Sequence, residues 1–449
     1  MAFTTHQAEK MDSAPVDPAR ILEIELAEPL PDVDAGPGYR RALAIVRLHS
    51  VPIGQVMIDL SAGTAERGEV ASAVDSALRE AVNRHLAGDG FSAVERIGRE
   101  GVPSAGVPRC VADREAYLGG DPPFVSVIVP TRERAERLGR CLASIMRTAY
   151  PPERREIIVV DNDPQTAETR ALIDRSFPGV RYVREDAPGS ASARNRGVEQ
   201  ARGELVVFTD DDVLVDRHWL LELARAYDAA PGVGAVTGLL VPMELETPAQ
   251  VWFEQYGGFG RGYERRVYNL TDSRPPDPLF PYSAGVFGTG NSMSFRRSVL
   301  DAIGGFDPAL GNGTPALGGV DSEVLLRTVL EGHTLVYEPR SLAYHAHRRD
   351  YAGLRRQVLS YGTGLSAYLL KTMIERPRLL PDFAARVPRG VAYALSPRSG
   401  KNARKERGYP RRLTFDELRG MAYGPIAYFR SRRRYGPADP RKRHAARRR

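Results

Sequence analysis

The sequence contains little cysteine and no long apolar run. Its 449 residues include 2 cysteines, Cys110 and Cys141, which are too few for a disulfide framework or a zinc site and indicate a reducing compartment. The N-terminus lacks the apolar stretch of a signal peptide, and no segment reaches the ~18 apolar residues of a membrane span. These absences predict a cytoplasmic protein. The hydrophobic content of 42% is enough for real cores and excludes overall disorder.

Acidic residues are scarce in one part of the chain only. Residues 386–449 hold 20 Lys and Arg against 4 Asp and Glu, a net charge of +16, while the remainder carries −9 of the total of +7. The composition of this basic segment predicts a partly flexible tail with one short helix over 413–429. A tail of this kind suits contact with an anionic membrane or a partner, or it stays solvated, and the sequence leaves both open.

Apolar patterning divides the chain into five predicted parts. They are a disordered N-terminus (1–19), a small α/β accessory domain without a chemical motif (20–120), a main α/β domain (121–350), a helical extension (351–385) and the basic tail (386–449). Within the main domain, apolar runs such as FVSVIVP, EIIVV and LVVF alternate with helical patterns. This alternation predicts a mostly parallel, Rossmann-like sheet flanked by helices.

Polar residues stand at the ends of three predicted strands, where parallel sheets bind ligands. These are Pro130-Thr131-Arg132, Asp161-Asn162-Asp163 and Asp210-Asp211-Asp212. Adjacent carboxylates repel one another, and a divalent cation that bridges to a phosphate relieves this cost. The alternative for the aspartate triplet is a solvated turn that caps the next helix. Asp161 suits hydrogen bonds to a base or ribose, or a simple turn.

Three further groups have both a chemical and a structural interpretation. GSASARNRG places Arg194 at a helix start, which favours anions, although such stretches are usually loops. Asp321 and Glu323 open a helix, where a carboxylate serves as a general base or complements the helix dipole. His345 and His347 follow a strand and are metal ligands or solvated surface residues.

In their order along the chain, several motifs resemble those of family 2 glycosyltransferases with the GT-A fold. They are VSVIVPTRERAERL, EIIVVDND, APGSASARNRG, LVVFTDDD, FGTGNSMSFRR with IGGFD, GGVDSEVLLR, and EP followed by AYH, and they cover roughly residues 124–350. The resemblance implies an inverting, metal-dependent transfer of a sugar from a nucleotide-diphosphate donor to an acceptor hydroxyl, in polysaccharide, glycolipid or glycoconjugate synthesis. It also implies Mn²⁺ or Mg²⁺ as the cofactor and a carbohydrate or lipid-linked acceptor.

The resemblance implies a role for each matching residue. Asp321 would be the catalytic base, and Asp212 and His345 would hold the metal. The nucleotide-sugar would contact Pro130, Thr131, Arg132, Arg134, Asp161, Arg194, Asp210 and Asp211. One position departs from the family pattern, because Val320 precedes Asp321 where a glutamate that often contacts the acceptor is usual. The aromatic-rich region 240–290 suits stacking on a sugar or packing against the core.

Two other classes of protein compete with this interpretation. The basic tail suits a nucleic-acid-binding protein, but no recognition module is visible, so nucleic acid is not expected as a partner. An inactive scaffold of the same fold is the second alternative, against which Asp212, Asp321 and His345 argue. The tail and its apolar stretch MAYGPIAYF suit peripheral contact with the inner face of the cell membrane, and the alternative that the tail stays solvated remains open.

Overall fold

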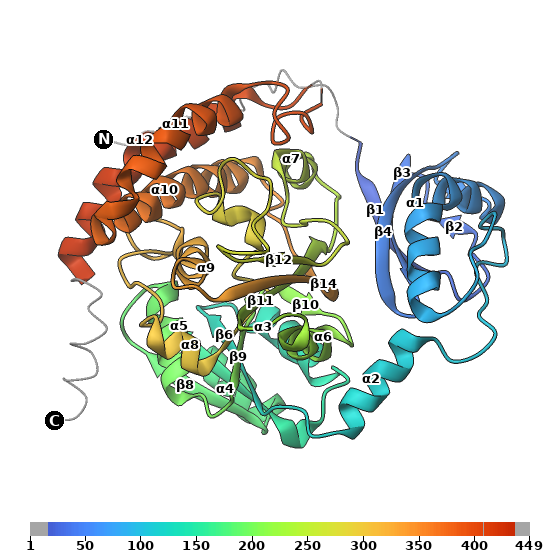
Figure 1. Cartoon of the computed structure of the whole chain (residues 1–449), viewed down its shortest axis with the longest axis horizontal. Coiled ribbons are helices and arrows are strands. Elements are labelled where there is room, and N and C mark those ends of the chain that lie inside the picture. Colours follow the sequence, from blue (N-terminus) through green and yellow to red (C-terminus); the bar gives the residue numbers. More distant parts are fainter. Residues whose placement is uncertain (1–16, 407, 436–449) are drawn as a thin grey trace.

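The computed structural model describes residues 17–406 and 408–435. A small N-terminal unit lies beside a large α/β domain, and long C-terminal helices run across the opposite side of that domain (Figure 1). The predicted disordered N-terminus lies outside the described residues up to position 16, whereas Ala19 already belongs to a strand. Positions 436–449 of the predicted tail also lie outside the described residues.

The N-terminal unit is a three-stranded sheet covered by one long helix. β3 (Arg41–Leu48) lies between β1 (Ala19–Glu25), which is parallel to it, and β4 (Val51–Asp59), which is antiparallel. The covering helix, α1 (Arg67–Asp89), has its apolar side in the core of the unit. The remaining elements are the paired strands β2 (Val33–Asp34) and β5 (Thr64–Ala65) and the connecting helix α2 (Arg109–Gly119).

The large domain is built on a nine-stranded sheet in the order β10-β14-β11-β13-β9-β6-β7-β8, with β12 paired to β14. Six strands share one direction: β6 (Val125–Thr131), β7 (Arg155–Asn162), β8 (Val180–Glu185), β9 (Leu205–Phe208), β11 (Val233–Pro242) and β14 (Thr334–His345). Three run against them: β10 (Val213–Val215), β12 (Arg266–Tyr268) and β13 (Met293–Arg296). The predicted mostly parallel α/β sheet is confirmed.

Helices cover both faces of this sheet. One face carries α3 (Ala135–Met146), α4 (Glu168–Ser176) and α6 (Trp219–Arg225), and the other carries α5 (Ser190–Gln200), α8 (Arg297–Ala302) and α9 (Val320–Leu330). The nearly continuous apolar run of β6 is explained by this arrangement. Val127 and Val129 pack in the cluster of α3, while Ile128 packs in the cluster of α5 and α9.

The C-terminal part consists of α10 (Tyr351–Glu375), α11 (Leu380–Leu395) and α12 (Arg411–Tyr435). The segment predicted as a partly flexible tail differs from expectation, because 411–435 form one helix that packs along α10 and buries Leu413 and Tyr428. Composition alone suggested a flexible segment because the many arginines of this helix outnumber the apolar residues of its narrow buried stripe. Across residues 17–406 and 408–435, no helix combines the length and apolar character needed to cross a membrane.

The aromatic-rich region between β11 and β13 is mainly packed against the core. It contains α7 (Pro248–Tyr256), whose start is fixed by a capping box between Thr247 and Gln250. Trp252 and Phe253 are each only 1% exposed, so their side chains pack rather than line an open sugar site. Short 3₁₀ turns occupy Pro152–Arg154, Ala226–Asp228, Ala284–Phe287 and Pro377–Leu379.

Candidate active site

The aspartate triplet lies between β9 and β10, at the carboxyl end of β9, as the apolar run predicted. Asp211 accepts hydrogen bonds from Thr131 Oγ1 at 2.8 Å and from Arg134 Nη1 at 3.1 Å. Asp212 Oδ2 lies 3.6 Å from the same Arg134 nitrogen and 3.9 Å from Arg137 Nη1. Asp211 and Asp212 are buried, which is not compatible with the alternative of a solvated turn.

Asp321 and Asp210 meet around Arg194 and Gly290. The Gly290 N–H donates to Asp321 Oδ2 at 3.0 Å, and Arg194 Nη2 donates to Asp210 Oδ1 at 3.0 Å. A Cβ added to Gly290 would lie 3.1 Å from both Asp321 Oδ2 and Arg194 Nη2. Desolvation raises the pKa of Asp210 to about 6 against the opposing effect of Arg194, and the neighbouring carboxylates add to the increase. The structure therefore brings these residues into one site.

His345 ends β14 and lies beside the triplet because β14 pairs with β10, where His345 is opposite Val213. Its Nε2 is 3.6 Å from Asp212 Oδ1, and its Nδ1 is 2.9 Å from His347 Nδ1. His347 Nε2 in turn lies 2.8 Å from Glu254 Oε1. Both histidines are buried, so the alternative of solvated surface residues is wrong.

Asp212 and His345 have the chemistry of a divalent metal site. Burial lowers the pKa of His345 to about 3, which keeps the imidazole neutral, as a metal ligand must be. One carboxylate and one neutral imidazole fit Mn²⁺ or Mg²⁺, which take their remaining ligands from water and substrate oxygens. The contact to His347 orients the ring so that Nε2 faces Asp212.

The predicted nucleotide residues on β6 and β7 lie next to this site. Asp161 is the register partner of Thr131, and Pro130 is the partner of Val160. Asp161 is completely buried; its Oδ2 accepts from Tyr182 Oη at 3.0 Å, and its Oδ1 has no hydrogen-bond partner among the described residues. Burial raises its pKa.

Arg132 follows β6 on the exposed side of this group and forms an ion pair with Asp163. The strand ends are therefore where the sequence predicted them. The base of a nucleotide could reach the Asp161 carboxylate only if the residues that cover this carboxylate move.

The two carboxylates in the first turn of α9 have different surroundings. Glu323 is buried and accepts from Lys371 Nζ and Arg327 Nη2, each at 2.8 Å. These ion pairs make it a structural residue rather than a general base. Val320, which replaces the glutamate usual in the family pattern, is 4% exposed and packs in the core.

The described cavities lie to one side of the aspartates. One of about 540 Å³ is bounded by the N-terminal sheet, the end of β11 and α7, and its lining includes Leu43, Leu240 and Glu254. Glu254 also binds His347, so this cavity adjoins the site behind the two histidines.

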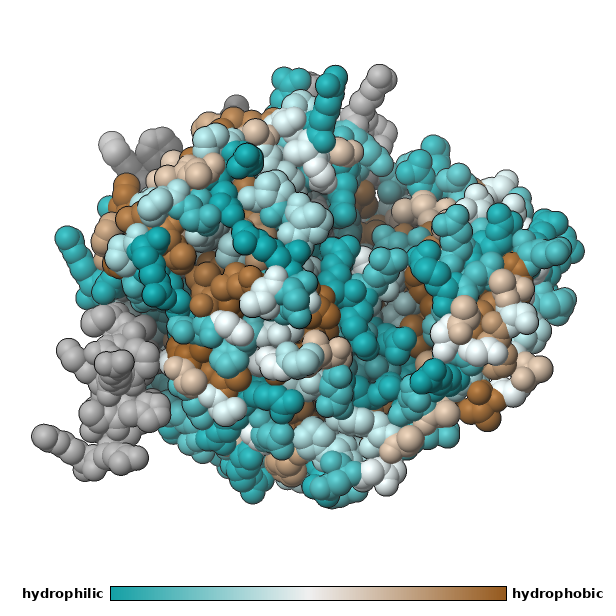
Figure 2. Space-filling model, in the orientation of Figure 1, coloured by the Kyte–Doolittle hydropathy of each residue, from teal (hydrophilic) through white to brown (hydrophobic). Residues whose placement is uncertain are grey.

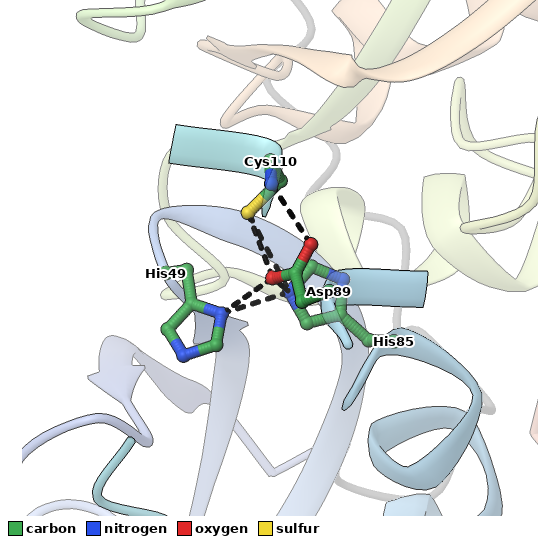
Figure 3. A group of neighbouring side chains, drawn as sticks. All are labelled: His49, His85, Asp89 and Cys110. Carbon is green, nitrogen blue, oxygen red and sulfur yellow. Dashed lines mark hydrogen bonds and ion pairs between the residues drawn. The ribbon is translucent and has the colours of Figure 1, made fainter. Parts of the chain in front are cut away.

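One group of chemically active side chains was missed by the sequence analysis. His49, His85, Asp89 and Cys110 converge in the N-terminal unit, which had been described as lacking a chemical motif (Figure 3). A count of two cysteines therefore does not exclude a zinc site. The four residues come from three separate parts of the chain, and the only local signal is that His85 and Asp89 are four positions apart on one helix.

The comparisons with known proteins agree with the motifs. Residues 126–304 match the model of "Glycosyl transferase family 2". A 119-residue stretch is 37% identical to Glycosyltransferase AglE of Haloferax volcanii and covers 26% of this chain and 39% of that protein. A 297-residue stretch is 29% identical to the O-antigen biosynthesis protein RfbC of Myxococcus xanthus and covers 64% and 21%, respectively. The chain thus spans less than half the length of these relatives.

Among solved structures, one similar to this chain is a mannosyltransferase from Pyrobaculum calidifontis in complex with GDP-Man and Mn²⁺. It is 19% identical, with a TM-score of 0.41, and the match covers 75% of this chain and 85% of that one.

Proposed function

We propose, from the match of residues 126–304 to the model of glycosyl transferase family 2, that the protein is an inverting glycosyltransferase that moves a sugar from a nucleotide-diphosphate donor to an acceptor hydroxyl. The observation that carries the proposal is the arrangement around Gly290. Its backbone N–H holds Asp321, and the neighbouring Arg194 holds Asp210. A base and a diphosphate-binding group are thereby within reach of one substrate.

Asp321 acts as the general base in this proposal. Its Oδ2 accepts from Gly290 N at 3.0 Å and its Oδ1 from Ser322 N at 2.9 Å, which fixes the carboxylate while each oxygen keeps a second lone pair. The acceptor hydroxyl transfers its proton to Asp321 as its oxygen attacks the anomeric carbon. The bond to the diphosphate breaks on the opposite side of the sugar, so one displacement inverts the configuration.

The donor is proposed to lie over β6, β7 and the start of α5. Arg194 is buried, and its Nε has no partner among the described residues, which suits a further bond to a diphosphate oxygen. The adjacent end of β6 is lined by Pro130, Thr131, Arg132 and Arg134. Asp161 is proposed to bind the base once it is uncovered, through the carboxylate oxygen that has no partner.

Asp212 and His345 would hold the divalent metal, Mn²⁺ or Mg²⁺, and Asp210 and Asp211 would support it. Such an ion supplies positive charge that stabilises a departing diphosphate. The aspartates keep their positions through Arg134 and Thr131.

Asp321→Asn tests the base directly. Nucleotide-sugars are first screened with Mn²⁺ by thermal shift, because a true donor raises the melting temperature by mass action. The variant should keep that shift and lose transfer by about 10²–10⁴-fold. Asp301→Asn, on the exposed end of α8, is the control and should keep both.

Transfer retained in Asp321→Asn would overturn the base assignment. If no donor shifts the melting temperature and none is turned over, the alternatives of an inactive scaffold or a nucleic-acid-binding protein gain support. A salt-sensitive gel shift separates these two.

We further propose a carbohydrate or lipid-linked acceptor and peripheral contact with an anionic membrane. α11 has no fully buried side chain in the described structure and places Leu380, Val387, Val391 and Leu395 along one face. Exposed apolar residues also gather at the α11 and α12 end of the molecule in Figure 2 (upper left). Arg389 in α11 and Arg398 just beyond its end are exposed, and basic residues beside an apolar helix face favour binding to anionic lipid.

Vesicle flotation tests the membrane contact. The full chain should float with anionic phospholipid vesicles and not with neutral ones, and the double variant Val387→Asp with Val391→Asp should lose flotation. Val107→Asp, at a 70% exposed position in the N-terminal unit, is the matched control. Failure of the unaltered chain to float with anionic vesicles would contradict the proposal.

A further inference from the structure

Four metal-ligating side chains of the N-terminal unit point toward one another (Figure 3). His49 lies in the turn between β3 and β4, His85 and Asp89 lie one turn apart near the end of α1, and Cys110 lies in the first turn of α2. From this geometry we propose that His49, His85, Asp89 and Cys110 bind a structural transition-metal ion, with Zn²⁺ as the ion that the donor set favours.

The four donor atoms all lie within 4.8 Å of one another. Asp89 Oδ2 lies 2.7 Å from His49 Nδ1, 3.1 Å from His85 Nε2 and 2.9 Å from Cys110 Sγ. The two imidazole nitrogens are 3.2 Å apart, and Cys110 Sγ is 3.9 Å from His85 Nε2. Ligand atoms around tetrahedral Zn²⁺ are about 3.3–3.8 Å apart, given metal–ligand distances of about 2.0–2.3 Å. Shifts of a few tenths of an ångström would therefore complete the site.

The groups behind the ligands hold them in place, as is usual around metal ions. His49 Nε2 lies 2.6 Å from Ser104 Oγ, which leaves Nδ1 facing the centre. Asp89 Oδ1 accepts from the Cys110 backbone N–H at 2.9 Å, so Oδ2 is the oxygen that faces the centre. Glu25 accepts from the backbone of His49 and of Ser50, each at 2.9 Å, and fixes the turn, in which both residues have positive φ.

Charge and burial also suit a dication. His49, Asp89 and Cys110 are buried and His85 is half-buried. Burial lowers the pKa of His85 to about 4, which leaves a neutral ligand. Burial and the Asp89 carboxylate raise the pKa of the Cys110 thiol to about 12, so a thiolate here requires a cation. Zn²⁺ with one carboxylate, one thiolate and two neutral imidazoles gives a site without net charge.

A structural rather than catalytic role follows from the number of ligands. Four protein ligands complete a tetrahedral zinc site, whereas catalytic zinc keeps an open position. The ion would join the β3–β4 turn, α1 and α2. In α2, Arg114 donates to the His49 carbonyl oxygen at 2.8 Å and to Glu222 of α6 at 2.7 Å. The metal would therefore fasten α2 at the point where the N-terminal unit meets the large domain.

Metal content of the full chain tests the site. Protein purified without chelator should contain one zinc ion per chain by mass spectrometry, and chelation should lower the melting temperature until zinc, but not magnesium, is restored. Asp212→Ala should keep this zinc, which separates it from the proposed active-site metal. Cys110→Ser and His85→Gln should lose it, and Cys141→Ser, at the other buried cysteine, is the matched control.

Cobalt substitution of the unaltered chain keeps the test independent of variant folding. Co²⁺ at the site should give a thiolate-to-cobalt charge-transfer band that persists in Cys141→Ser and is absent in Cys110→Ser. A folded chain that holds no zinc after dialysis against it and shows no such band would overturn the proposal. Zinc that is lost in Asp212→Ala but kept in Cys110→Ser would overturn it as well.

Discussion

Glu323 and Asp321 stand two positions apart in α9, yet only Asp321 faces the proposed substrate. Burial raises the pKa of Glu323, but the charges and hydrogen bonds of Arg327 and Lys371 lower it by more, so the pKa is about 2. Because this value lies below the ordinary 4.5, ionised Glu323 stabilises the fold above pH 4.5, and the contribution is lost as the pH falls toward 2.

Glu323→Gln should therefore destabilise the protein at neutral pH by about 3–5 kcal/mol, because it leaves buried cations without their partner. The difference from the unaltered chain should shrink as the pH falls through the range below 4.5. Thermal unfolding at pH values from 7 downward measures both effects. Glu331→Gln, at the exposed end of α9, is the control and should cost about 0–1 kcal/mol. Equal melting of Glu323→Gln and the unaltered chain at pH 7 would refute the structural assignment.

Gly290 provides a test of the site geometry that does not alter a charged group. Its missing Cβ would lie 3.0 Å from Asp321 Cβ and 3.1 Å from Arg194 Nη2. Gly290→Ala must therefore displace the base or the arginine, and transfer should fall by about 10–100-fold. Gly285→Ala, where a Cβ meets nothing within 4 Å, should leave transfer unchanged. Steady-state kinetics compares the two, and equal rates would show that the close approach at Gly290 has no role in catalysis.

At the scale of elements, local patterns in the sequence predict the strands and their polar ends, but they do not show which distant elements lie side by side. Asp161 and Asp210 were placed at strand ends because an apolar strand and its polar end are adjacent in the chain. The approach of His345 to Asp212 requires the antiparallel pairing of β10 with β14, which no local pattern encodes, so only the resemblance to a family implied it. The grouping of His49 with Cys110 requires three elements and was missed for the same reason.

The pairing of α10 and α12 depends on close contacts at glycines in addition to the narrow buried stripe of α12. A Cβ added to Gly420 would lie 2.3 Å from the Leu359 carbonyl oxygen, and one added to Gly424 would lie 2.4 Å from that of Thr363. On its other side, α10 touches the start of α9, where a Cβ on Gly364 would lie 2.6 Å from Gly319 N. The C-terminal helix therefore supports, through α10, the turn that presents the base.

Gly424→Val should separate α12 from α10, because the added side chain would meet not only Ser366 Oγ but also the Thr363 carbonyl oxygen, a backbone atom that cannot rotate away. Overpacking costs about 1–3 kcal/mol where neighbours adjust, so at least that loss is expected. Trypsin should then cleave the arginine-rich α12 faster, which limited proteolysis measures. Ala422→Val, at an exposed position two residues before Gly424 on the same helix, should leave the cleavage rate unchanged. Unchanged cleavage in Gly424→Val would contradict the close packing.

At the scale of the whole molecule, the N-terminal unit is joined to the large domain by buried ion pairs. Arg47 of β3 is 7% exposed and donates to Asp216 Oδ2 at 2.7 Å and to Tyr344 Oη at 2.6 Å. Tyr344 immediately precedes His345 in β14. The net charge of the chain gives no sign of this interface, because each positive charge in it is paired with a negative charge.

Arg47→Met should lower stability by about 3–5 kcal/mol, since it leaves the largely buried Asp216 carboxylate, 12% exposed, without its cation. Arg41→Met, on the same strand but in an exposed pair with Asp59 at 3.6 Å, is the matched control and should cost about 0–1 kcal/mol. Combining Arg47→Met with Asp216→Asn removes both charges and should recover part of the loss.

Calorimetry of these variants distinguishes a joined unit from an independent one. If the interface couples the two parts, the unaltered chain unfolds in a single transition and Arg47→Met shifts or splits it. If the N-terminal unit is independent, Arg47→Met leaves the transition of the large domain where it was, and the coupling is refuted. Because Tyr344 adjoins His345, the coupled case also predicts weaker Mn²⁺-dependent donor binding in Arg47→Met than in Arg41→Met, which a thermal-shift titration measures.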